Sequence, residues 1–427
     1  LDSPAWLLCG VAVFPGQSRP VGILYWRYFF TPPEGWGEAR GLYLATSWYR
    51  QGHRVWVLTG GSYFPAELRK RLGKRRVFRT AAGLPIIWFP TPYHQKQPLW
   101  QRLWSFVRFT VFSFYIFYRL RRKNLYILGV VPPPTTLWGA ALWRKITGQP
   151  FALEVTDAWP QVLEELGFVK TLFRGLLRKA FAWGYQKADF IAAYSPGILG
   201  SLRPFAGKIP LFVSHNGVQP VAFRRAGPPP YLPFRLVYAG TFGRINNLDF
   251  LLEVARHLLP WRGIQVWLIG DGSEIERLKS QARALPNVRL FPPVPPEKLP
   301  YWLNQCHIGV STVLPVESLS RNAASKFYMY LASGLVVGIN YAGWQAQILE
   351  QYQCGFSATD PYAFAQKVLE YYQKRCLWWD FQARGRLIAE RFFDIRAIGM
   401  ELLEKLCTFA QDVRSGVAQA EAAALGV

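Results

Sequence analysis

Short, continuous apolar runs alternate with amphipathic stretches along most of the chain. The runs at 21–26, 54–59 and 85–89 are five or six residues long and show no regular polar alternation. Strands of this kind are typical of parallel sheets that helices cover on both faces. The stretches between them, such as 38–50, have helical spacing. The pattern therefore predicts an α/β fold built from Rossmann-like, doubly wound sheets.

This strand–helix pattern occurs twice, on either side of a proline-rich stretch that includes Pro228, Pro229 and Pro230. A chain of 427 residues is long enough for two domains with separate cores. The prediction leaves open whether the helices at the C-terminal end cross back to the first domain. The predicted parts are an extension at 1–20, a first domain at 21–218, a linker at 219–233, a second domain at 234–375, C-terminal helices at 376–412 and a tail at 413–427.

Local signals mark two helix starts in the first domain. Ser195 followed by Pro196 predicts the start of a helix, because serine is a favoured cap and proline fits the first helical position. A loop with Gly35 and Gly37 precedes the helix predicted at 38–50. A glycine-containing loop over a helix N-terminus is the part of a βαβ unit that contacts ligands.

Positive charge is concentrated in the first half of the chain. The formal net charge is +24; residues up to 227 contribute 30 Lys and Arg against 9 Asp and Glu, a net of +21, which leaves +3 for the remainder. This asymmetry indicates that nucleic acid or an anionic membrane surface is a partner of the first half. The sequence has no recognised nucleic-acid motif, and its cations are interleaved with apolar clusters, which favours the membrane surface.

Two basic segments, 99–123 and 168–187, also carry many Trp, Phe and Leu residues. The longest uncharged run in the first segment, 109–118, has ten residues, whereas a membrane-spanning helix needs about 20. Aromatic residues and cations beside an apolar face are typical of a helix that lies in the lipid interface. A buried core helix is the alternative interpretation of 99–123.

Neither a metal site nor a cofactor is predicted. The five cysteines are scattered without metal-ligand spacing, and the five histidines form no cluster. An odd number of unpaired cysteines is typical of a reducing compartment, which indicates a cytoplasmic protein. The apolar run at 7–14 has no positively charged segment before it, so it does not resemble a signal peptide.

The stretch 321–355 carries the candidate anion site. A polar loop precedes a predicted helix that starts near Ala323 or Ser325, and an apolar strand and a second helix follow. Lys326 lies in the first turn of that helix, where a cation is normally disfavoured unless an anion is bound. This arrangement indicates a phosphate site, and an ordinary surface lysine is the alternative.

The same stretch resembles the signature of family-4 glycosyltransferases, in the subgroup that builds bacterial surface polysaccharides such as O-antigen, capsule and colanic acid. In the first half, the runs 52–59 and 154–160 are similar to motifs of the same subgroup. The resemblance covers nearly all of residues 21–412. The matching parts of the signature are Ser325-Lys326-Phe327, Tyr330-Leu331-Ala332-Ser333-Gly334 and Cys354-Gly355-Phe356.

The resemblance implies a GT-B architecture, in which two Rossmann-like domains face a cleft that binds a nucleotide-sugar. It implies a hexosyl- or N-acetylhexosaminyltransferase that retains the configuration of the sugar and needs no metal ion. The implied acceptor is linked to a polyprenyl diphosphate, which places the enzyme peripherally on the inner face of the plasma membrane. The expected partners are therefore a nucleotide-sugar, a lipid-linked acceptor and an anionic membrane surface, with no nucleic acid.

The resemblance also assigns candidate site residues. Arg244 and Lys326 would stabilise the leaving nucleotide diphosphate. Asp157 would contact the acceptor hydroxyl, unless it is only a helix cap before Trp159-Pro160. Glycines in the donor loops would let the backbone approach the diphosphate closely. The candidate donor-binding residues are Gly240, Gly243, Gly270, Asn322, Ser325 and Gly343, and the candidate acceptor-loop residues are Gly35 and Gly37.

Several positions depart from the family pattern. Arg321 and Met329 occupy the places of two glutamates, and Trp344 stands where a glutamate usually follows the glycine. Thr241 and Asn246 replace an arginine and a lysine of the donor loop. These departures motivate a second hypothesis, a donor-binding scaffold that has lost catalysis. A basic nucleic-acid-binding protein is the third hypothesis, and only the charge supports it.

Overall fold

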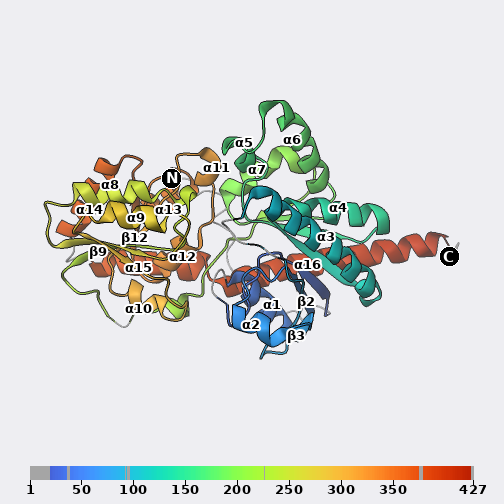
Figure 1. Ribbon diagram of the computed structural model, residues 1–427. Helices are drawn as coiled ribbons and strands as arrows, with labels where there is room; N and C mark the ends of the chain where they lie inside the picture. The colour runs from blue at the N-terminus through green and yellow to red at the C-terminus, as the bar shows by residue number, and fades with distance from the viewer. Residues whose placement is uncertain are drawn as a thin grey trace. The chain divides into compact units, whose positions relative to one another are not determined.

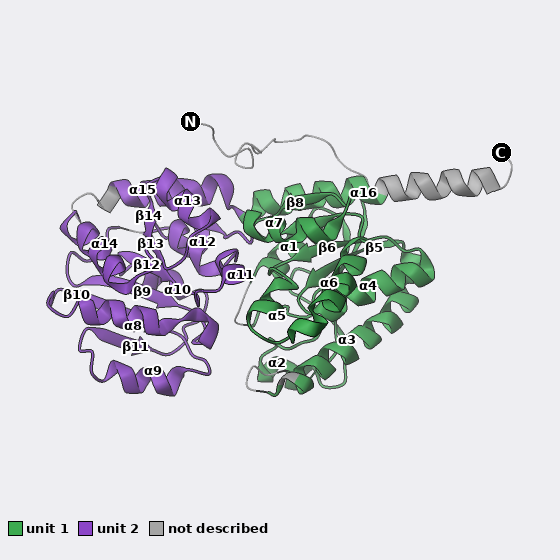
Figure 2. Cartoon of the chain, turned by 90° about the horizontal axis from the view of Figure 1, so that it is seen from above, with its two compact units in different colours: residues 1–215, 395–427 green, residues 216–394 purple. Residues whose placement is uncertain are grey.

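The computed structural model describes residues 20–35, 39–91, 93, 97–225, 227–374 and 378–424. The chain forms two compact units, which we call the first and the second unit (Figure 2). The first unit comprises residues up to 215 together with those from 395 onward, and the second comprises 216–394. Each unit contains one sheet of mostly parallel strands, as the apolar pattern predicts. The predicted extension lies outside the described residues except for its last position.

The sheet of the first unit has the strand order β3-β4-β2-β1-β5-β6-β7-β8. Neighbouring strands are parallel, except that β3 pairs antiparallel with β4. The central strands are buried along their whole length, which is why they read as continuous apolar runs. The strands are β1 (Gly22–Trp26), β2 (Arg54–Thr59), β3 (Val77–Arg79), β4 (Pro85–Trp88), β5 (Leu125–Val131), β6 (Phe151–Val155), β7 (Ile191–Ala193) and β8 (Leu211–Val213).

The helices of the first unit are α1 (Arg40–Arg50), α2 (Ala66–Leu72), α3 (Leu99–Leu120), η2 (Arg121–Lys123), α4 (Pro134–Thr147), α5 (Gln161–Glu165), α6 (Thr171–Tyr185), α7 (Pro196–Ala206) and α16 (Ile395–Ala424). The crossover through α1 runs along the sheet in one direction, and those through α3, α4, α6 and α7 run in the other. Because crossovers between parallel strands are right-handed, the two groups lie on opposite faces of the sheet (Figure 1). The predicted cap at Ser195 is confirmed, since its side chain accepts a hydrogen bond from the Ile198 amide at 3.0 Å.

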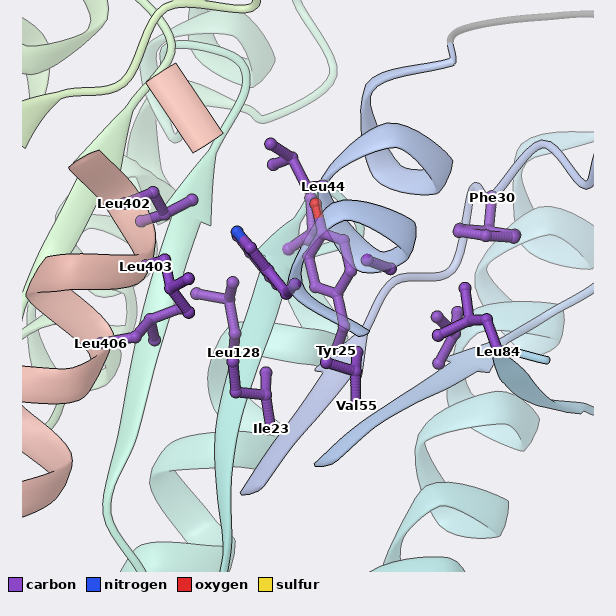
Figure 3. Close-up of a cluster of buried hydrophobic side chains, with 14 of the residues drawn as sticks. Ile23, Tyr25, Phe30, Leu44, Val55, Leu84, Leu128, Leu402, Leu403 and Leu406 are labelled. Carbon is purple, nitrogen blue, oxygen red and sulfur yellow. The ribbon is translucent and has the colours of Figure 1, made fainter. Parts of the chain in front are cut away.

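The C-terminal helix α16 belongs to the first unit and packs on α1. The indole Nε1 of Trp48 donates a hydrogen bond to the carbonyl of Gly399 at 2.9 Å. Leucines of α16 join side chains of α1 and of the central strands in one buried apolar cluster (Figure 3). The predicted tail at 413–427 is helical as far as Ala424. Members of the cluster include Ile23, Leu44, Val55, Leu128, Leu402, Leu403 and Leu406.

The sheet of the second unit has the strand order β11-β10-β9-β12-β13-β14, and all its pairs are parallel. Its strands are β9 (Phe234–Ala239), β10 (Ile264–Ile269), β11 (Val288–Phe291), β12 (Ile308–Ser311), β13 (Val336–Ile339) and β14 (Gly355–Ser357). Its helices are η3 (Pro220–Phe223), η4 (Arg244–Asn246), α8 (Leu248–His257), α9 (Ile275–Ala282), α10 (Leu299–Leu303), α11 (Glu317–Ser320), α12 (Ser325–Ala332), α13 (Trp344–Gln351), α14 (Pro361–Gln373) and α15 (Trp378–Phe392).

The segment predicted as a linker, 219–233, forms part of the second unit in the structure. It begins with η3, which packs against α12 and α15. The chain enters and leaves this unit side by side, because the Val218 amide donates a hydrogen bond to the carbonyl of Phe393 at 2.9 Å. The change of unit therefore follows His215, and the predicted C-terminal helices are divided, with α15 in the second unit and α16 in the first.

Over the described ranges, no helix combines the length and the apolar character that crossing a membrane requires. The most apolar long segment, α3, has one buried and one exposed side. Phe109 and Phe117 are buried beneath it, whereas Trp104 and Val111 are more than half exposed. The alternative interpretation of 99–123 as a buried core helix is therefore wrong, and the lipid-interface interpretation stays a prediction.

Candidate functional site

The carboxyl ends of the strands in the second unit gather the candidate donor-binding residues. From β9 the chain proceeds through β10 to β11 and then returns to β12 on the other side of β9. Ligands of open α/β sheets bind at the carboxyl edge beside such a reversal of strand order. Gly240 and Gly243 follow β9, Gly270 follows β10, and the remaining candidates follow β12 or β13. Because the strands are parallel, all of these loops lie at one edge.

The backbone requires glycine at Gly240 and at Gly270, in the loops after β9 and β10. Gly270 has a φ of 153°, and a Cβ there would lie only 1.9 Å from the carbonyl oxygen of Gly240. Gly240 has a φ of 155° and donates its amide to the carbonyl of Ile269 at 3.0 Å. The loops after β9 and β10 are thus in direct contact. Gly243 differs, because its φ is −103° and a Cβ at this position would lie 3.6 Å from its nearest neighbour; its backbone would accept a side chain.

Lys326 lies beside Gly240 at this edge. Its Nζ donates a hydrogen bond to the hydroxyl of Tyr238 at 3.2 Å and lies 4.5 Å from the centre of that ring. The Tyr238 hydroxyl in turn donates to the carbonyl of Thr241 at 2.9 Å, which orients it to accept from the lysine. The side chain of Lys326 is half-buried, and burial lowers its pKa to about 8. Lys326 is therefore a desolvated cation held against a glycine loop, and the alternative of an ordinary surface lysine is wrong.

Asn216, the first residue of the second unit, contacts the N-terminus of α12 through its side chain. The helix begins at Ser325, and its N-cap, Ala324, has no side chain that could satisfy the free amides. Asn216 donates its side-chain amide to the Ser325 hydroxyl at 2.9 Å and to the Ala323 carbonyl at 3.0 Å. The positive end of the helix and the charge of Lys326 therefore act in the same place, which suits an anion.

Asn322, a candidate donor-binding residue, uses its side chain to hydrogen-bond the backbone of its own loop. Its side-chain oxygen accepts from the Ala324 amide at 3.0 Å, and its side-chain nitrogen donates to the Leu319 carbonyl. The indole of Trp344 donates to the Asn322 carbonyl at 3.0 Å. Gly343, directly before this tryptophan, has a φ of 116°, which favours glycine. These contacts fix the loop that leads into α12.

Trp344, where the family pattern has a glutamate, is a packing residue. It is 5% exposed, and its ring lies 5.7 Å from that of Phe327, 6.3 Å from that of Tyr328 and 6.4 Å from that of Phe393, measured between centroids. Met329 is half-buried on the same helix as two of these aromatics. Apolar contacts have therefore replaced the expected acidic groups on this side of the loop.

Arg244, the second proposed cation, occupies a different environment from Lys326. It is the first residue of η4, and its side chain is exposed. Asn246 closes this turn by donating its side-chain amide to the Thr241 carbonyl at 2.9 Å. The loop after β9 thus carries a solvent-exposed cation, while Lys326 supplies the desolvated one.

The candidates of the first unit lie at the carboxyl edge of its own sheet. Asp157 follows β6 and accepts a hydrogen bond from the Thr156 hydroxyl at 2.8 Å. It does not cap the next helix, since the N-cap of α5 is Pro160, so the alternative interpretation of a helix cap is wrong. Gly35 closes a turn by donating its amide to the Pro32 carbonyl at 2.9 Å. Gly37 lies outside the described residues.

A buried charge network at this edge was missed by the sequence analysis. Glu154 is fully buried and accepts hydrogen bonds from the Tyr25 hydroxyl at 2.5 Å and from the Arg40 guanidinium at 2.7 Å. Arg40 also donates to the Ser214 hydroxyl at 2.7 Å. The guanidinium of Arg27 lies 4.0 Å from Glu154 and donates to the Tyr25 hydroxyl at 3.1 Å. Two arginines and one carboxylate are therefore held together out of water.

The sequence contained a signal for this network. Arg40 falls on the same face of its helix as Leu44 and Trp48, at spacings of four and eight residues, and this face is buried. Glu154 interrupts an otherwise apolar strand. A charged side chain on a buried face needs a partner of opposite charge. By this requirement, Arg40 could have been paired with Glu154.

Within the part of the chain that the structure describes, no three His, Cys, Asp or Glu side chains are grouped so as to hold a metal ion. The described cysteines Cys306, Cys354 and Cys407 are buried thiols that form no disulfide. Lys326, Arg244 and the N-terminus of α12 place positive charge at the carboxyl edge of this sheet.

Comparison with known proteins identifies the fold but no close relative. No protein-family model matches the sequence, and no curated protein matches it. Sucrose-phosphate synthase from Thermosynechococcus elongatus has a similar structure, with a TM-score of 0.72 at 14% identity over 91% of this chain and 99% of that chain. The Anabaena protein HepE in complex with UDP gives 0.66 at 15% identity, over 91% of this chain and 100% of that one.

A third similar structure is WaaG, described as a glycosyltransferase involved in lipopolysaccharide biosynthesis. Its TM-score is 0.63 at 12% identity, over 91% of this chain and 99% of that chain. These structures are GT-B glycosyltransferases, so the predicted fold class, with two Rossmann-like units, is confirmed.

Proposed function

We propose that this protein is a glycosyltransferase that moves a sugar, with retention of configuration, from a nucleotide-sugar donor to a lipid-linked acceptor. The observation that carries the proposal is Lys326, a desolvated cation in the first turn of α12 beside Gly240. A cation at the positive end of a helix suits a diphosphate. The GT-B fold supports the choice of a nucleotide-sugar, and the similar protein HepE was solved with UDP and with UDP-glucose.

In the proposed reaction, the bond between the sugar and the nucleotide diphosphate breaks as the acceptor oxygen bonds to the same carbon. Negative charge grows on the departing diphosphate, so groups that bind it more tightly in the transition state accelerate transfer. Lys326, the free amides of α12 and the exposed Arg244 are the groups proposed for this role. We propose that they act without a metal ion or cofactor, because they already supply positive charge at the leaving group.

For the acceptor, we propose a saccharide carried on a polyprenyl diphosphate in the synthesis of a surface polysaccharide. Asp157, at the carboxyl end of β6, is the proposed contact to the acceptor hydroxyl, and Gly35 and Gly37 are the proposed acceptor loop. The transferred group is proposed to be a hexose or an N-acetylhexosamine. An acceptor of this kind locates the enzyme on the cytoplasmic face of the plasma membrane as a peripheral protein.

The proposal is tested by replacing Lys326 with alanine and measuring nucleoside diphosphate binding by calorimetry. A charge-assisted hydrogen bond contributes about 1.5–3 kcal/mol, so Lys326→Ala should weaken binding roughly 10- to 150-fold. Sugar transfer should slow at least as much, because the leaving group gains charge in the transition state. Lys298→Ala is the control, since Lys298 is an exposed lysine of the same unit. Unchanged binding and turnover in Lys326→Ala would remove this residue from the site.

The packing of Trp344 favours one alternative, a scaffold that binds the donor without turning it over. The loop around Asn322 is held by an indole instead of a carboxylate, so binding could persist without the acidic groups of the family pattern. Release of nucleoside diphosphate from UDP-glucose and other candidate donors separates the two functions. Binding without release, over a panel of acceptors, would support the scaffold.

A further inference from the structure

The outer side of α3 carries an apolar stripe. Its residues recur at steps of three and four, so they share one face of the helix. Their exposed fractions range from 39% for Val107 to 67% for Trp100. At 1.5 Å per residue the stripe is about 27 Å long. We call it the outer stripe, and its members are Trp100, Trp104, Val107, Val111, Tyr115 and Tyr118.

The opposite side of α3 already packs on the sheet. Phe109 and Phe117 are buried and lie 6.3 and 5.0 Å from Trp26, measured between ring centroids. The orientation of the helix is therefore fixed by its inner side. The outer stripe remains 39–67% exposed after this packing, so its apolar character needs another explanation.

Two neighbouring helices extend the apolar surface. α4 packs against both α3 and α6, and the three helices lie side by side on one face of the sheet (Figures 1 and 2). In α4, Leu142 and Ile146 are 42% and 67% exposed; in α6, Leu172 and Leu176 are 86% and 70% exposed. Soluble monomers rarely expose apolar patches that continue over several elements, and such patches mark interaction sites. We call this surface the α3–α4–α6 face.

The α3–α4–α6 face is rich in cations and its helices contain no acid. Residues 68–153, which include α3 and α4, have 16 Lys and Arg and no Asp or Glu, and α6 has no acid either. Arg119 and Arg121 lie over the rings of Tyr115 and Tyr118, 5.9 and 3.7 Å from their centroids. The exposed cations of α3, η2, α4 and α6 are Arg108, Arg119, Arg121, Arg122, Lys123, Lys145, Arg178 and Lys179.

The positive charge of the α3–α4–α6 face favours an anionic bilayer over a second copy of the chain as its partner. A second copy of the chain would set cations against cations, and the helices of the face have no acid to pair with them. An anionic bilayer offers hydrocarbon to the apolar side chains and phosphate groups to the cations. Trp, Tyr and Arg, which alternate along α3, are residues that favour the region between the two.

We propose that the α3–α4–α6 face docks the first unit onto an anionic lipid bilayer. α3 lies in the plane of the interface, with the outer stripe inserted among the acyl chains and Arg108, Arg119 and Arg121 at the level of the phosphates. This proposal names the surface behind the peripheral location of the proposed function. It is tested separately, because nucleotide binding belongs to the second unit and lipid binding to the first.

The first test is sedimentation of the full chain with vesicles. Vesicles of phosphatidylglycerol and phosphatidylcholine should bind the protein at least tenfold more tightly than vesicles of phosphatidylcholine alone. Raising the salt from 0.1 to 1 M shortens the Debye length from about 10 to 3 Å, so it should release most of the protein. Equal binding to both kinds of vesicle, or no binding to either, would overturn the proposal.

The second test removes the apolar contact. The variant Trp104→Glu/Val111→Glu places two carboxylates in the outer stripe and should lower binding to the anionic vesicles at least tenfold. The matched control is Tyr301→Glu/Tyr362→Glu, which makes the same charge change at side chains of the second unit that are 70% and 58% exposed. The control should bind within twofold of the wild type. Equal losses in both variants would assign the effect to total charge and would overturn the proposed face.

The third test removes cations. Replacing Arg119, Arg121, Arg122 and Lys123 with glutamine should release the protein from anionic vesicles. The control replaces four other exposed cations of the same unit with glutamine, namely Arg69, Lys70, Lys74 and Arg75, and should retain most of the binding. All variants should keep the wild-type hydrogen-exchange protection of β1 and β5, which shows that the first unit folds, and should bind nucleoside diphosphate as the wild type does.

Self-association through the α3–α4–α6 face would give a different result from docking on a bilayer. Ultracentrifugation without lipid would then show a dimer of the wild type and a monomer of the Trp104→Glu/Val111→Glu variant, with vesicle binding unchanged. That combination would assign the face to self-association and overturn docking on a bilayer.

Discussion

Individual side chains set the electrostatics of the candidate donor site. Lys326 is the central residue of this site. The Tyr238 hydroxyl accepts a hydrogen bond from its Nζ, Gly240 leaves space beside it, and burial lowers its pKa to about 8. The positive N-terminal end of α12 also disfavours protonation of Lys326, as burial does. An anion bound here would reverse both effects, because it favours the charged lysine.

We therefore predict that nucleoside diphosphate binding weakens as the pH rises above about 8. Free Lys326 loses its charge above its lowered pKa, so binding at higher pH must first take up a proton. The affinity should fall up to tenfold per pH unit between about pH 8 and 10. Calorimetry at pH 9 in two buffers with different ionisation enthalpies should detect the proton uptake. The Lys326→Arg variant keeps its charge and should lose this pH dependence; an unaltered profile in that variant would contradict the assignment.

The buried network in the first unit leads to a second prediction. Glu154 is the carboxylate that Arg40 contacts, and Arg27 lies 4.0 Å from it. Glu154→Gln would leave two buried guanidinium groups without their acid and should lower the free energy of unfolding by about 3–5 kcal/mol. The control is Glu34→Gln, which breaks an exposed ion pair with Arg71 and should cost less than about 1 kcal/mol. Urea unfolding measures both, and similar values for the two would show that the network is not stabilising.

Among the secondary-structure elements, α16 is the one that returns the chain to the first unit. Its leucines complete the apolar cluster of the first unit, although more than 170 residues of the second unit separate it from β8. Its contact with α1 depends on Gly399, where a Cβ would lie 2.7 Å from Cδ2 of Leu44. The Trp48 indole bonds the carbonyl of the same glycine. The docking of α16 is therefore set by one close approach between two helices.

We predict that Gly399→Leu loosens α16 from α1. Overpacking of this kind costs about 1–3 kcal/mol, and here it also displaces the Trp48 hydrogen bond. Hydrogen exchange should become faster in α1 and in α16 while α8 and α14 in the second unit keep their protection. Met400→Leu is the control, because Met400 is adjacent and 51% exposed. Unchanged exchange in α1 would mean that the two helices tolerate the side chain by sliding.

At the scale of whole units, two histidines make the stability of the first unit depend on acid. Burial lowers the pKa of His53, and burial together with the charge of Arg40 lowers the pKa of His215 to about 3. In the unfolded chain both would titrate near 6.5. Between these values the unfolded state binds more protons than the native state, so stability falls as the pH falls.

The resulting prediction is that the first unit loses stability below about pH 6.5. Its urea midpoint, followed by hydrogen exchange in β1 and β5, should decrease steadily from pH 7 to pH 4. His215→Gln removes one of the two groups and should make this decrease smaller. A variant whose midpoint falls as steeply as that of the wild type would exclude His215 as a cause.

Patterns within short stretches were enough to predict the α/β class and the start of α7 at Pro196. Continuous apolar runs recur because both faces of each sheet are covered, and the cap at Ser195 depends on neighbours three residues away. The gathering of Gly240, Gly270 and Lys326 also followed from the pattern, because parallel strands place their carboxyl ends at one edge. These properties are local or follow from the order of the elements.

Contacts between distant residues decided the rest. The pairing of Arg40 with Glu154, the packing of Trp344 where a carboxylate was expected and the return of α16 to the first unit each join positions far apart in the chain. The outward orientation of Trp104 in α3 was decided in the same way, since the sheet buries Phe109 and Phe117 and leaves the other side exposed. Apolar spacing identifies the faces of a helix, but only the packing of the unit determines which face is covered.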